Sequence, residues 1–154
     1  MHGRIFELRE QILPEDEWIT EYSFCEHDDR SWYDWMCESE NREEDIQWLK
    51  DVLPPSIFRV SGEVVEIISD GREFVEAWIE ELKKEVNALS YDEFRPWAPL
   101  YRIQSRMKNM LRADFMFVTD YDDYPHDPTT FIRHCINQYK GKKLYICGIC
   151  DYHN

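Results

Sequence analysis

Residues 144–154, LYICGICDYHN, close the chain and decide how its last third is built. Cys147, Cys150 and His153 are zinc-binding residue types, and a tight turn at Gly148 would bring the two thiols together. The same run is apolar on both faces of an extended chain, as a buried central strand is. Residues three apart on a strand point to opposite faces unless Gly148 breaks the strand. We therefore predict a strand here, and not a metal knuckle.

A zinc site would also need a second pair of ligands. The chain offers Cys25 with His27, or His134 with Cys135, and neither pair has the spacing of a known zinc finger. Cysteine is among the residue types most often buried in ordinary cores. The five cysteines are odd in number and scattered, unlike a secreted disulfide framework. We expect reduced, mostly buried thiols, no bound metal and no cofactor.

The length and composition favour one folded domain. The 154 residues can form one core but not two, and 15% of them are aromatic, which is unlike a disordered acidic chain. The first residues do not form a signal peptide, and 18 apolar residues never occur together. The sequence therefore predicts a cytoplasmic protein.

The periodicity of apolar residues predicts a single α+β domain with a mixed sheet and the element order β-α-α-ββ-α-α-β-α-β. The predicted strands are 4–9, two within 57–68, 114–119 and 143–150; the predicted helices are one near 28–36, one from Asn41 to Pro54, one at 72–89, one after Pro96 and one after Asp127-Pro128. Helix 72–89 carries an apolar stripe that includes Trp78, so we expect it to cover one face of the sheet, with Ser69 or Asp70 as its cap. The last strand, helix and strand are expected to form a βαβ unit.

The loop TDYDDYPHD, residues 119–127, follows a predicted central strand and precedes a helix, which is where ligands bind in open α/β sheets. Its candidate metal ligands are Asp120, Asp122, Asp123 and His126, and His126 could act as acid or base. The spacing does not fit an EF-hand, because Pro125 stands where glycine is needed and Phe131 where the bidentate glutamate should be. Asp127 is also expected to cap the next helix. We favour a solvated turn.

Charge is distributed unevenly along the chain. The net charge of −14 divides into −10 for residues 1–50, −6 for 51–100 and +2 for 101–154. No acid lies between Glu93 and Asp114, and the predicted helix 97–111 is basic. Two interpretations of this helix stay open: it packs against the acidic N-terminal third of the chain, which we favour, or it binds a phosphate-bearing ligand.

Residues 15–45 hold 13 acids and two arginines, interleaved with aromatic residues. Such a surface repels nucleic acid and anionic membranes and attracts a basic partner. Aromatic side chains provide interface anchors, and like-charged surroundings steer the partner toward them. The candidate binding residues are Trp18, Asp28, Asp29, Trp32, Trp35, Glu43 and Glu44. A solvated acidic face over an aromatic core is the alternative interpretation.

The segments HGRIFEL, EDEWITEYSF and REEDIQWLKD resemble those of small acidic proteins from phages and conjugative elements, a group that includes anti-restriction and other anti-defence factors. The resemblance covers the first third of the chain and implies a protein that acts by binding another protein. No functional residue is carried over from it.

The sequence favours a non-enzymatic binding protein over an enzyme. It contains no nucleophile elbow and no glycine-rich phosphate loop. The expected partner is a nuclease or DNA-binding protein, whose basic groove would be occluded by carboxylates that mimic DNA phosphates. The alternative is a small metal-dependent hydrolase or phosphoryl-transfer enzyme that uses the Asp120–Asp127 loop.

Overall fold

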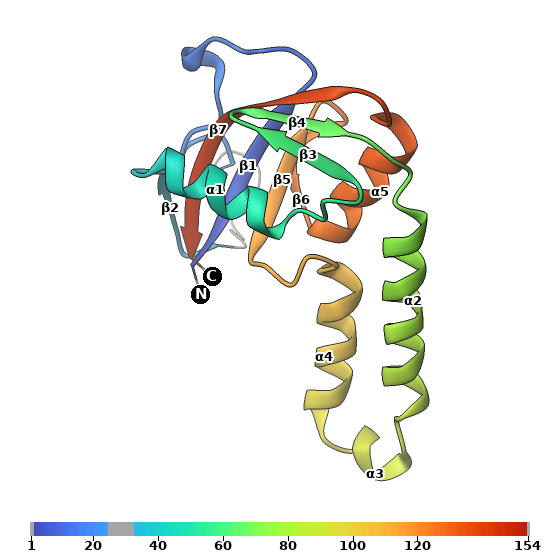
Figure 1. Ribbon diagram of the computed structural model, residues 1–154. Coiled ribbons are helices and arrows are strands. Elements are labelled where there is room, and N and C mark those ends of the chain that lie inside the picture. The colour runs from blue at the N-terminus through green and yellow to red at the C-terminus, as the bar shows by residue number, and fades with distance from the viewer. Residues whose placement is uncertain (1, 25–32, 154) are drawn as a thin grey trace.

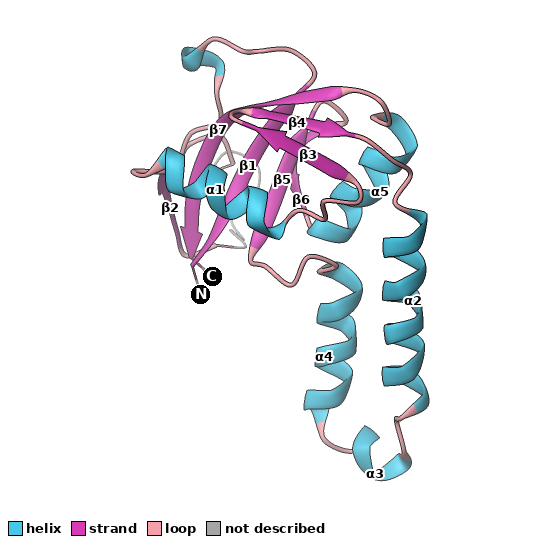
Figure 2. Cartoon of the chain, viewed as in Figure 1, coloured by secondary structure: helices cyan, strands magenta, loops and turns pink. Residues whose placement is uncertain are grey.

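The computed structural model describes residues 2–24 and 33–153. Its strands are β1 (His2–Arg9), β2 (Trp35–Glu38), β3 (Phe58–Ser61), β4 (Val64–Ile67), β5 (Phe115–Thr119), β6 (Asp122–His126) and β7 (Lys143–His153); its helices are the 3-10 turn η1 (Glu15–Glu17), α1 (Arg42–Val52), α2 (Arg72–Asn87), α3 (Tyr91–Phe94), α4 (Trp97–Lys108) and α5 (Pro128–Gln138). Figure 1 and Figure 2 show a mixed sheet with helices, so the predicted α+β fold is confirmed.

The sheet is organised around β7, the strand predicted from LYICGIC. Its strand order is β3-β4-β7-β1-β5-β6, and β2 also pairs with β7. Because β7 is 11 residues long, it pairs with β4 near its start, with β2 near its end and with β1 along nearly its whole length. Both β5 and β7 lie inside the sheet, as predicted. The apolar run on both faces of β7 is explained by this central position.

The order of the elements differs from the prediction at three places. Residues 35–38 form β2 where a helix near 28–36 was expected; residues 28–32 lie outside the described residues. The loop after β5 is a two-residue turn followed by β6, and the short α3 lies between α2 and α4. The predicted βαβ unit is wrong as well. Strand β1 is parallel to β5 and antiparallel to β7, so β5 and β7 run in opposite directions.

The two faces of the sheet bury different cores. The larger core includes Phe6 and Leu8 of β1, Phe117 of β5 and Phe131 of α5, and the rings of Phe117 and Phe131 stack with centroids 3.9 Å apart. On the opposite face, Ile5, Val118 and Cys150 pack against Ile19 from the segment that follows β1. Alternation along β1 places Glu7 on this second face, in an otherwise apolar setting.

Helices α2, α3 and α4 form an arm that projects away from the sheet (Figure 1). We expected α2 to cover a face of the sheet, and this is wrong, because none of its residues is fully buried. Only its first turns reach the core, through the half-buried Phe74, Val75 and Trp78. The remaining apolar stripe packs against α4, so the periodicity indicated a buried face without identifying the neighbour that buries it.

The start of α2 also differs from the expected serine or aspartate cap. The N-cap is Gly71, which has a φ of 63°. A β-carbon there would lie 2.6 Å from Cδ1 of Ile57, so both the conformation and the space require glycine. Ser69 and Asp70 support this turn instead: the hydroxyl of Ser69 accepts from the Gly71 amide, and the carboxylate of Asp70 accepts from the Arg72 amide.

Candidate functional site

A β-bulge interrupts the pairing of β1 with β7. Phe6 pairs with Ile149 and Leu8 with Ile146, so two residues of β7, Cys147 and Gly148, lie opposite Glu7. The extra residue places Ile146 and Ile149 on the same face, and both enter the larger core. Side chains of β7 therefore do not alternate regularly across Gly148. The expectation that Cys147 and Cys150 point to opposite faces of the strand is wrong for this reason.

Cys147 and Cys150 consequently both belong to the face covered by residues 10–24. They are 1% and 0% exposed. Burial raises the pKa of the Cys147 thiol, which also receives a hydrogen bond from the backbone of Leu13. Burial raises the pKa of the Cys150 thiol to about 12. The predicted strand is confirmed, and these are protonated thiols inside the protein.

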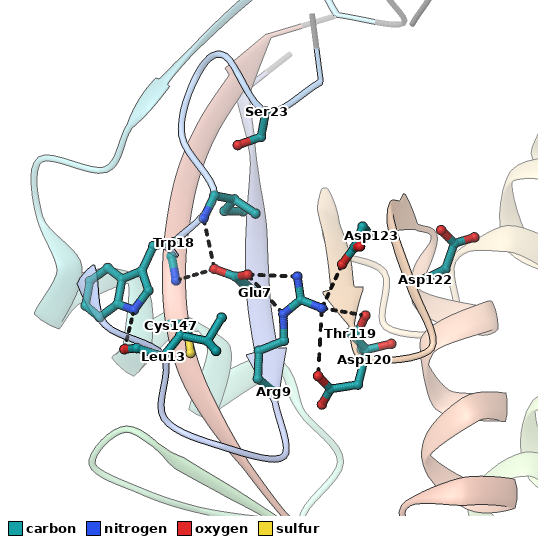
Figure 3. A network of polar contacts seen from close by, with 12 residues as sticks. Glu7, Arg9, Leu13, Trp18, Ser23, Thr119, Asp120, Asp122, Asp123 and Cys147 are labelled. Carbon is teal, nitrogen blue, oxygen red and sulfur yellow. Dashed lines mark hydrogen bonds and ion pairs between the residues drawn. The ribbon is translucent and has the colours of Figure 1, made fainter. Parts of the chain in front are cut away.

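Glu7 satisfies the amide group that the bulge removes from the strand pairing. Its Oε2 accepts from the backbone N–H of Gly148 and of Ile19, each at 3.0 Å, although its side chain is only 1% exposed. Its Oε1 accepts from Nε of Arg9 at 3.0 Å. Figure 3 shows the carboxylate between these groups. Glu7 therefore ties residues 10–24 to the bulge and leaves no buried charge unpaired.

Arg9 extends this network to the turn between β5 and β6 (Figure 3). Its guanidinium donates to the carbonyl of Thr119 at 3.0 Å and lies 2.9 Å from the carboxylate of Asp123. Burial lowers the pKa of Arg9, but hydrogen bonds to Asp123 and Glu7 outweigh it, and the net shift is upward. Asp120 lies 3.9 Å from the same guanidinium and accepts from the Glu10 amide.

The remaining candidate metal ligands of the 119–127 loop have other partners. The Asp122 carboxylate lies 3.7 Å from Nε2 of His126 and accepts from the Tyr124 amide. Asp127 caps α5 by accepting from the Thr130 amide, as predicted. Within residues 2–24 and 33–153, no three His, Cys, Asp or Glu side chains are grouped so that they could hold a metal ion. Asp120 and Asp123 thus lie beside the Arg9 guanidinium, and Asp122 lies beside His126.

Sequence reasoning missed a pair of histidines behind this loop. His134 lies off the apolar stripe of α5, a position that predicts an exposed side chain. It is instead half-buried against Tyr121, with ring centroids 4.0 Å apart, and its ring centroid is 5.1 Å from that of His126. Burial lowers the pKa of His134, and the nearby His126 and Arg133 lower it further. The i, i+3 spacing of Phe131 and His134 gave no indication of this contact, which depends on the fold of β6.

Arg42, at the start of α1, holds the carbonyl side of the bulge. Its guanidinium donates to the carbonyls of Cys147 and Ile146, at 2.5 and 2.7 Å, and pairs with Glu63 at 2.7 Å. It also lies 4.6 Å from the ring centroid of Trp18. Arg42 is one of only two arginines among the 13 acids of residues 15–45, and this isolation is the one feature of the sequence that could have identified it.

Exposed carboxylates surround this position. They come from η1, from β2 and the residues that follow it, and from the first turn of α1: Glu15, Asp16, Glu17, Glu38, Glu40, Glu43 and Glu44. We call this set the acidic face. None of the seven forms an ion pair with another residue in the described part of the chain. A hollow of about 120 Å³ has Glu15, Glu38 and Arg42 in its wall, and a neighbouring one of about 320 Å³ has Glu38, Glu40 and Trp35.

The predicted binding residues fall into three groups. Trp35, Glu43 and Glu44 are exposed, Trp35 to 47%, and they belong to β2 and α1 beside the hollows. Trp18 is half-buried, stacks on Arg42 and donates from Nε1 to the Leu13 carbonyl, so it supports the face from below. Asp28, Asp29 and Trp32 lie outside the described residues.

The basic charge at the end of α4 is compensated by α2, and not by the N-terminal third as we favoured. Arg106 pairs with Glu81 at 2.6 Å and with Glu85 at 3.3 Å, and Arg112 also pairs with Glu81. Both acids belong to α2, which lies beside α4 in the arm. The acidic face is therefore not used to neutralise this helix.

The comparisons with known proteins add no relative. No family model, no curated protein and no solved structure matches this chain. No helix of the described residues has both the length and the apolar character needed to cross a membrane.

Proposed function

We propose that this protein is a non-enzymatic binding protein whose acidic face docks on the basic surface of another protein. The observation that carries this proposal is a set of seven exposed carboxylates that have no ion-pair partner among the described residues, three of which, Glu15, Glu38 and Glu40, line two adjoining hollows. Such a surface attracts cations and accelerates encounter with a basic partner.

The hollows favour recognition of lysine and arginine side chains. Glu15 and Glu38 border the first hollow beside Arg42, and Glu38, Glu40 and Asp151 border the second beside Arg4. Both arginines are already paired with acids, Arg42 with Glu63 and Arg4 with Asp45 and Asp151, so carboxylates outnumber unpaired cations in each hollow. Trp35, exposed beside the second hollow, supplies an aromatic surface that stacks well on a guanidinium or packs as an interface anchor. Arg42 and Glu7 hold the underlying bulge in place, so the face is organised before the partner arrives.

We propose further that the partner is a nucleic-acid-handling protein, either a nuclease or a DNA-binding protein. Carboxylates on a fixed surface can occupy the lysines and arginines that otherwise bind phosphates, and binding then blocks access of DNA. This mechanism fits an anti-defence or immunity-type inhibitor. It rests on the charge of the face and on the resemblance of the first third of the chain to proteins of mobile elements.

The experiment is a capture assay followed by competition. The immobilised full chain is exposed to a bacterial lysate at low salt, and bound proteins are eluted either with duplex DNA or with salt. We expect a basic protein that DNA displaces and that the chain prevents from binding a labelled duplex.

A matched charge variant makes this experiment specific. Changing Glu15, Glu38, Glu43 and Glu44 to lysine should abolish capture, whereas changing Glu73, Glu76, Glu80 and Asp92 of the arm to lysine should leave capture nearly intact. Both variants change the net charge equally. If both variants lost capture, or if both kept it, the partner would not be bound specifically by the acidic face.

A further inference from the structure

The side of α4 that faces away from α2 carries exposed aromatic rings. Trp97 is 70% and Tyr101 53% exposed, and their rings stack with centroids 4.5 Å apart. Gln104 and Lys108 continue along the same side, because both border one groove together with Tyr101. We call these four residues the α4 stripe. Exposed apolar surface of this kind marks an interaction site more often than isolated surface residues do.

The other side of α4 is already covered. Arg106 pairs with Glu81 and Glu85 of α2, and Pro99 and Ile103 border a hollow that they share with Leu89. Helix α4 thus has apolar side chains on two opposite sides, and α2 covers one of them. A helix with this pattern is typical of one that lies between two neighbours.

The groove beside the α4 stripe has room for a large side chain. Its volume is about 400 Å³, and its far wall comes from the end of the sheet, including Met116 and Tyr152 of β5 and β7 and Asp127 before α5. The groove continues from Tyr101 to Lys108, so an aromatic side chain that entered it would contact both an apolar wall and the ammonium group of Lys108.

The α4 stripe is complementary to a second copy of itself. Its residues are spaced four, three and four apart, so two antiparallel copies would place each Trp97 opposite Lys108 and each Tyr101 opposite Gln104. Each contact joins an aromatic ring to a cation or an amide. No acid lies between Glu93 and Asp114, so the stripe itself offers no carboxylate to a cationic partner; the carboxylates that border the groove, Asp114 and Asp127, lie outside α4.

We propose that the protein forms a two-fold symmetric dimer through the α4 stripe, in which each Trp97 enters the groove beside Lys108 of the other copy. Contacts of this kind are closed and use the same patch on both subunits, as in most dimers of identical chains. The stripe and the acidic face belong to different elements, and the arm projects away from η1 and α1 (Figure 2).

Salt separates this proposal from the proposed function. The net charge of −14 opposes association of two copies, and the stripe itself is aromatic and amide-rich, so added salt should strengthen dimerisation. Capture of a basic partner by the acidic face should weaken under the same change. Either proposal can therefore fail while the other stands.

The test is sedimentation of the full chain across a wide range of protein concentration. We expect a monomer–dimer equilibrium, and the double change Trp97→Glu with Tyr101→Glu should weaken it by about 100-fold or more. The matched control is Val86→Glu with Tyr91→Glu, which introduces the same two charges at exposed apolar positions of the arm and should leave the equilibrium unchanged. Both variants replace exposed residues, and unaltered melting would show that they fold.

A second measurement locates the contact. Gln104→Cys, beside the proposed two-fold axis, should be joined to its counterpart by a short thiol cross-linker, whereas Glu80→Cys on α2 should not. A chain that stays monomeric at every concentration would overturn the proposal and assign the stripe to a different partner. A dimer that survives the Trp97 and Tyr101 change, or that cross-links equally through Glu80→Cys, would overturn it too.

Discussion

Glu7 is the residue on which the packing of residues 10–24 depends most. It sits on the face of β1 that buries Ile5 and Cys150, and it accepts from two backbone amides and from Arg9. An isolated strand sequence such as RIFELR does not reveal this, because an alternating glutamate reads as a solvent-facing residue. The bulge that creates a need for Glu7 depends on the register with β7, which only the folded sheet defines.

The removal of Glu7 should be costly. Glu7→Ala leaves the amides of Gly148 and Ile19 and the guanidinium of Arg9 without their acceptor, and we expect a loss of about 3–5 kcal/mol in the free energy of unfolding. Glu7→Gln keeps an acceptor oxygen and should cost less. Urea denaturation measures both, with the exposed Glu17→Ala as a control expected within about 0.5 kcal/mol of the native protein. A Glu7→Ala chain as stable as that control would show that the network contributes nothing.

Cys150 should make the protein sensitive to alkali. Its thiol ionises near 9.0 in the unfolded chain but at about 12 in the folded protein. Between these two pH values the thiol has lost its proton in the unfolded chain but keeps it in the folded protein. The contribution of this thiol to the free energy of unfolding is therefore intact below pH 9.0 and falls above it, by on the order of 1.4 kcal/mol per pH unit. Cys150→Ala should give a flatter stability curve above that pH, measured by urea unfolding. Curves of equal slope would contradict this assignment.

At the scale of elements, local sequence predicted the existence of most helices and strands but not their neighbours. The hairpin of β3 and β4, helix α1 and helix α5 with its Asp127 cap follow from turn residues, caps and periodicity. Strand β2 does not, because it is held by pairing with the end of β7, which is distant in sequence. The apolar stripe of α2 was predicted correctly, but the element that packs against most of it is α4 and not the sheet.

The arm changes what is expected for Trp78. The sequence predicts that Trp78→Ala costs about 3–5 kcal/mol, as a large-to-small change in the sheet core would. Trp78 is instead half-buried at the base of the arm and donates to the Arg106 carbonyl at 3.3 Å, so we expect about 1–3 kcal/mol.

Hydrogen exchange would show where that loss acts. We expect the amides of α4 to exchange faster in Trp78→Ala while those of β1 and β7 stay protected, because the arm touches the sheet only at its base. Uniformly faster exchange across the sheet would place Trp78 in the main core after all.

At the scale of the whole molecule, the arm and the acidic face differ in how their charges are paired. Arg106 of α4 and Arg112, which follows it, are paired with acids of α2, while the seven carboxylates of the acidic face have no ion-pair partner in residues 2–24 and 33–153. The sequence showed the acid surplus of residues 15–45 but not which members would be surface groups. Asp45 illustrates the limit: it lies among Glu43 and Glu44 in the sequence, yet it is buried and paired with Arg4 at 2.7 Å.

The most direct measurement is the association rate of the protein with its captured partner as a function of ionic strength. The Debye length falls from about 10 Å at 0.1 M to about 3 Å at 1 M salt, so steering by the acidic face should fade steeply over this range. We expect the rate constant of the native chain to fall strongly with salt. The lysine variant of Glu15, Glu38, Glu43 and Glu44 should associate slowly at every salt concentration, with little change in melting temperature. Fast association of that variant at low salt, equal to that of the native chain, would contradict a binding function for the acidic face.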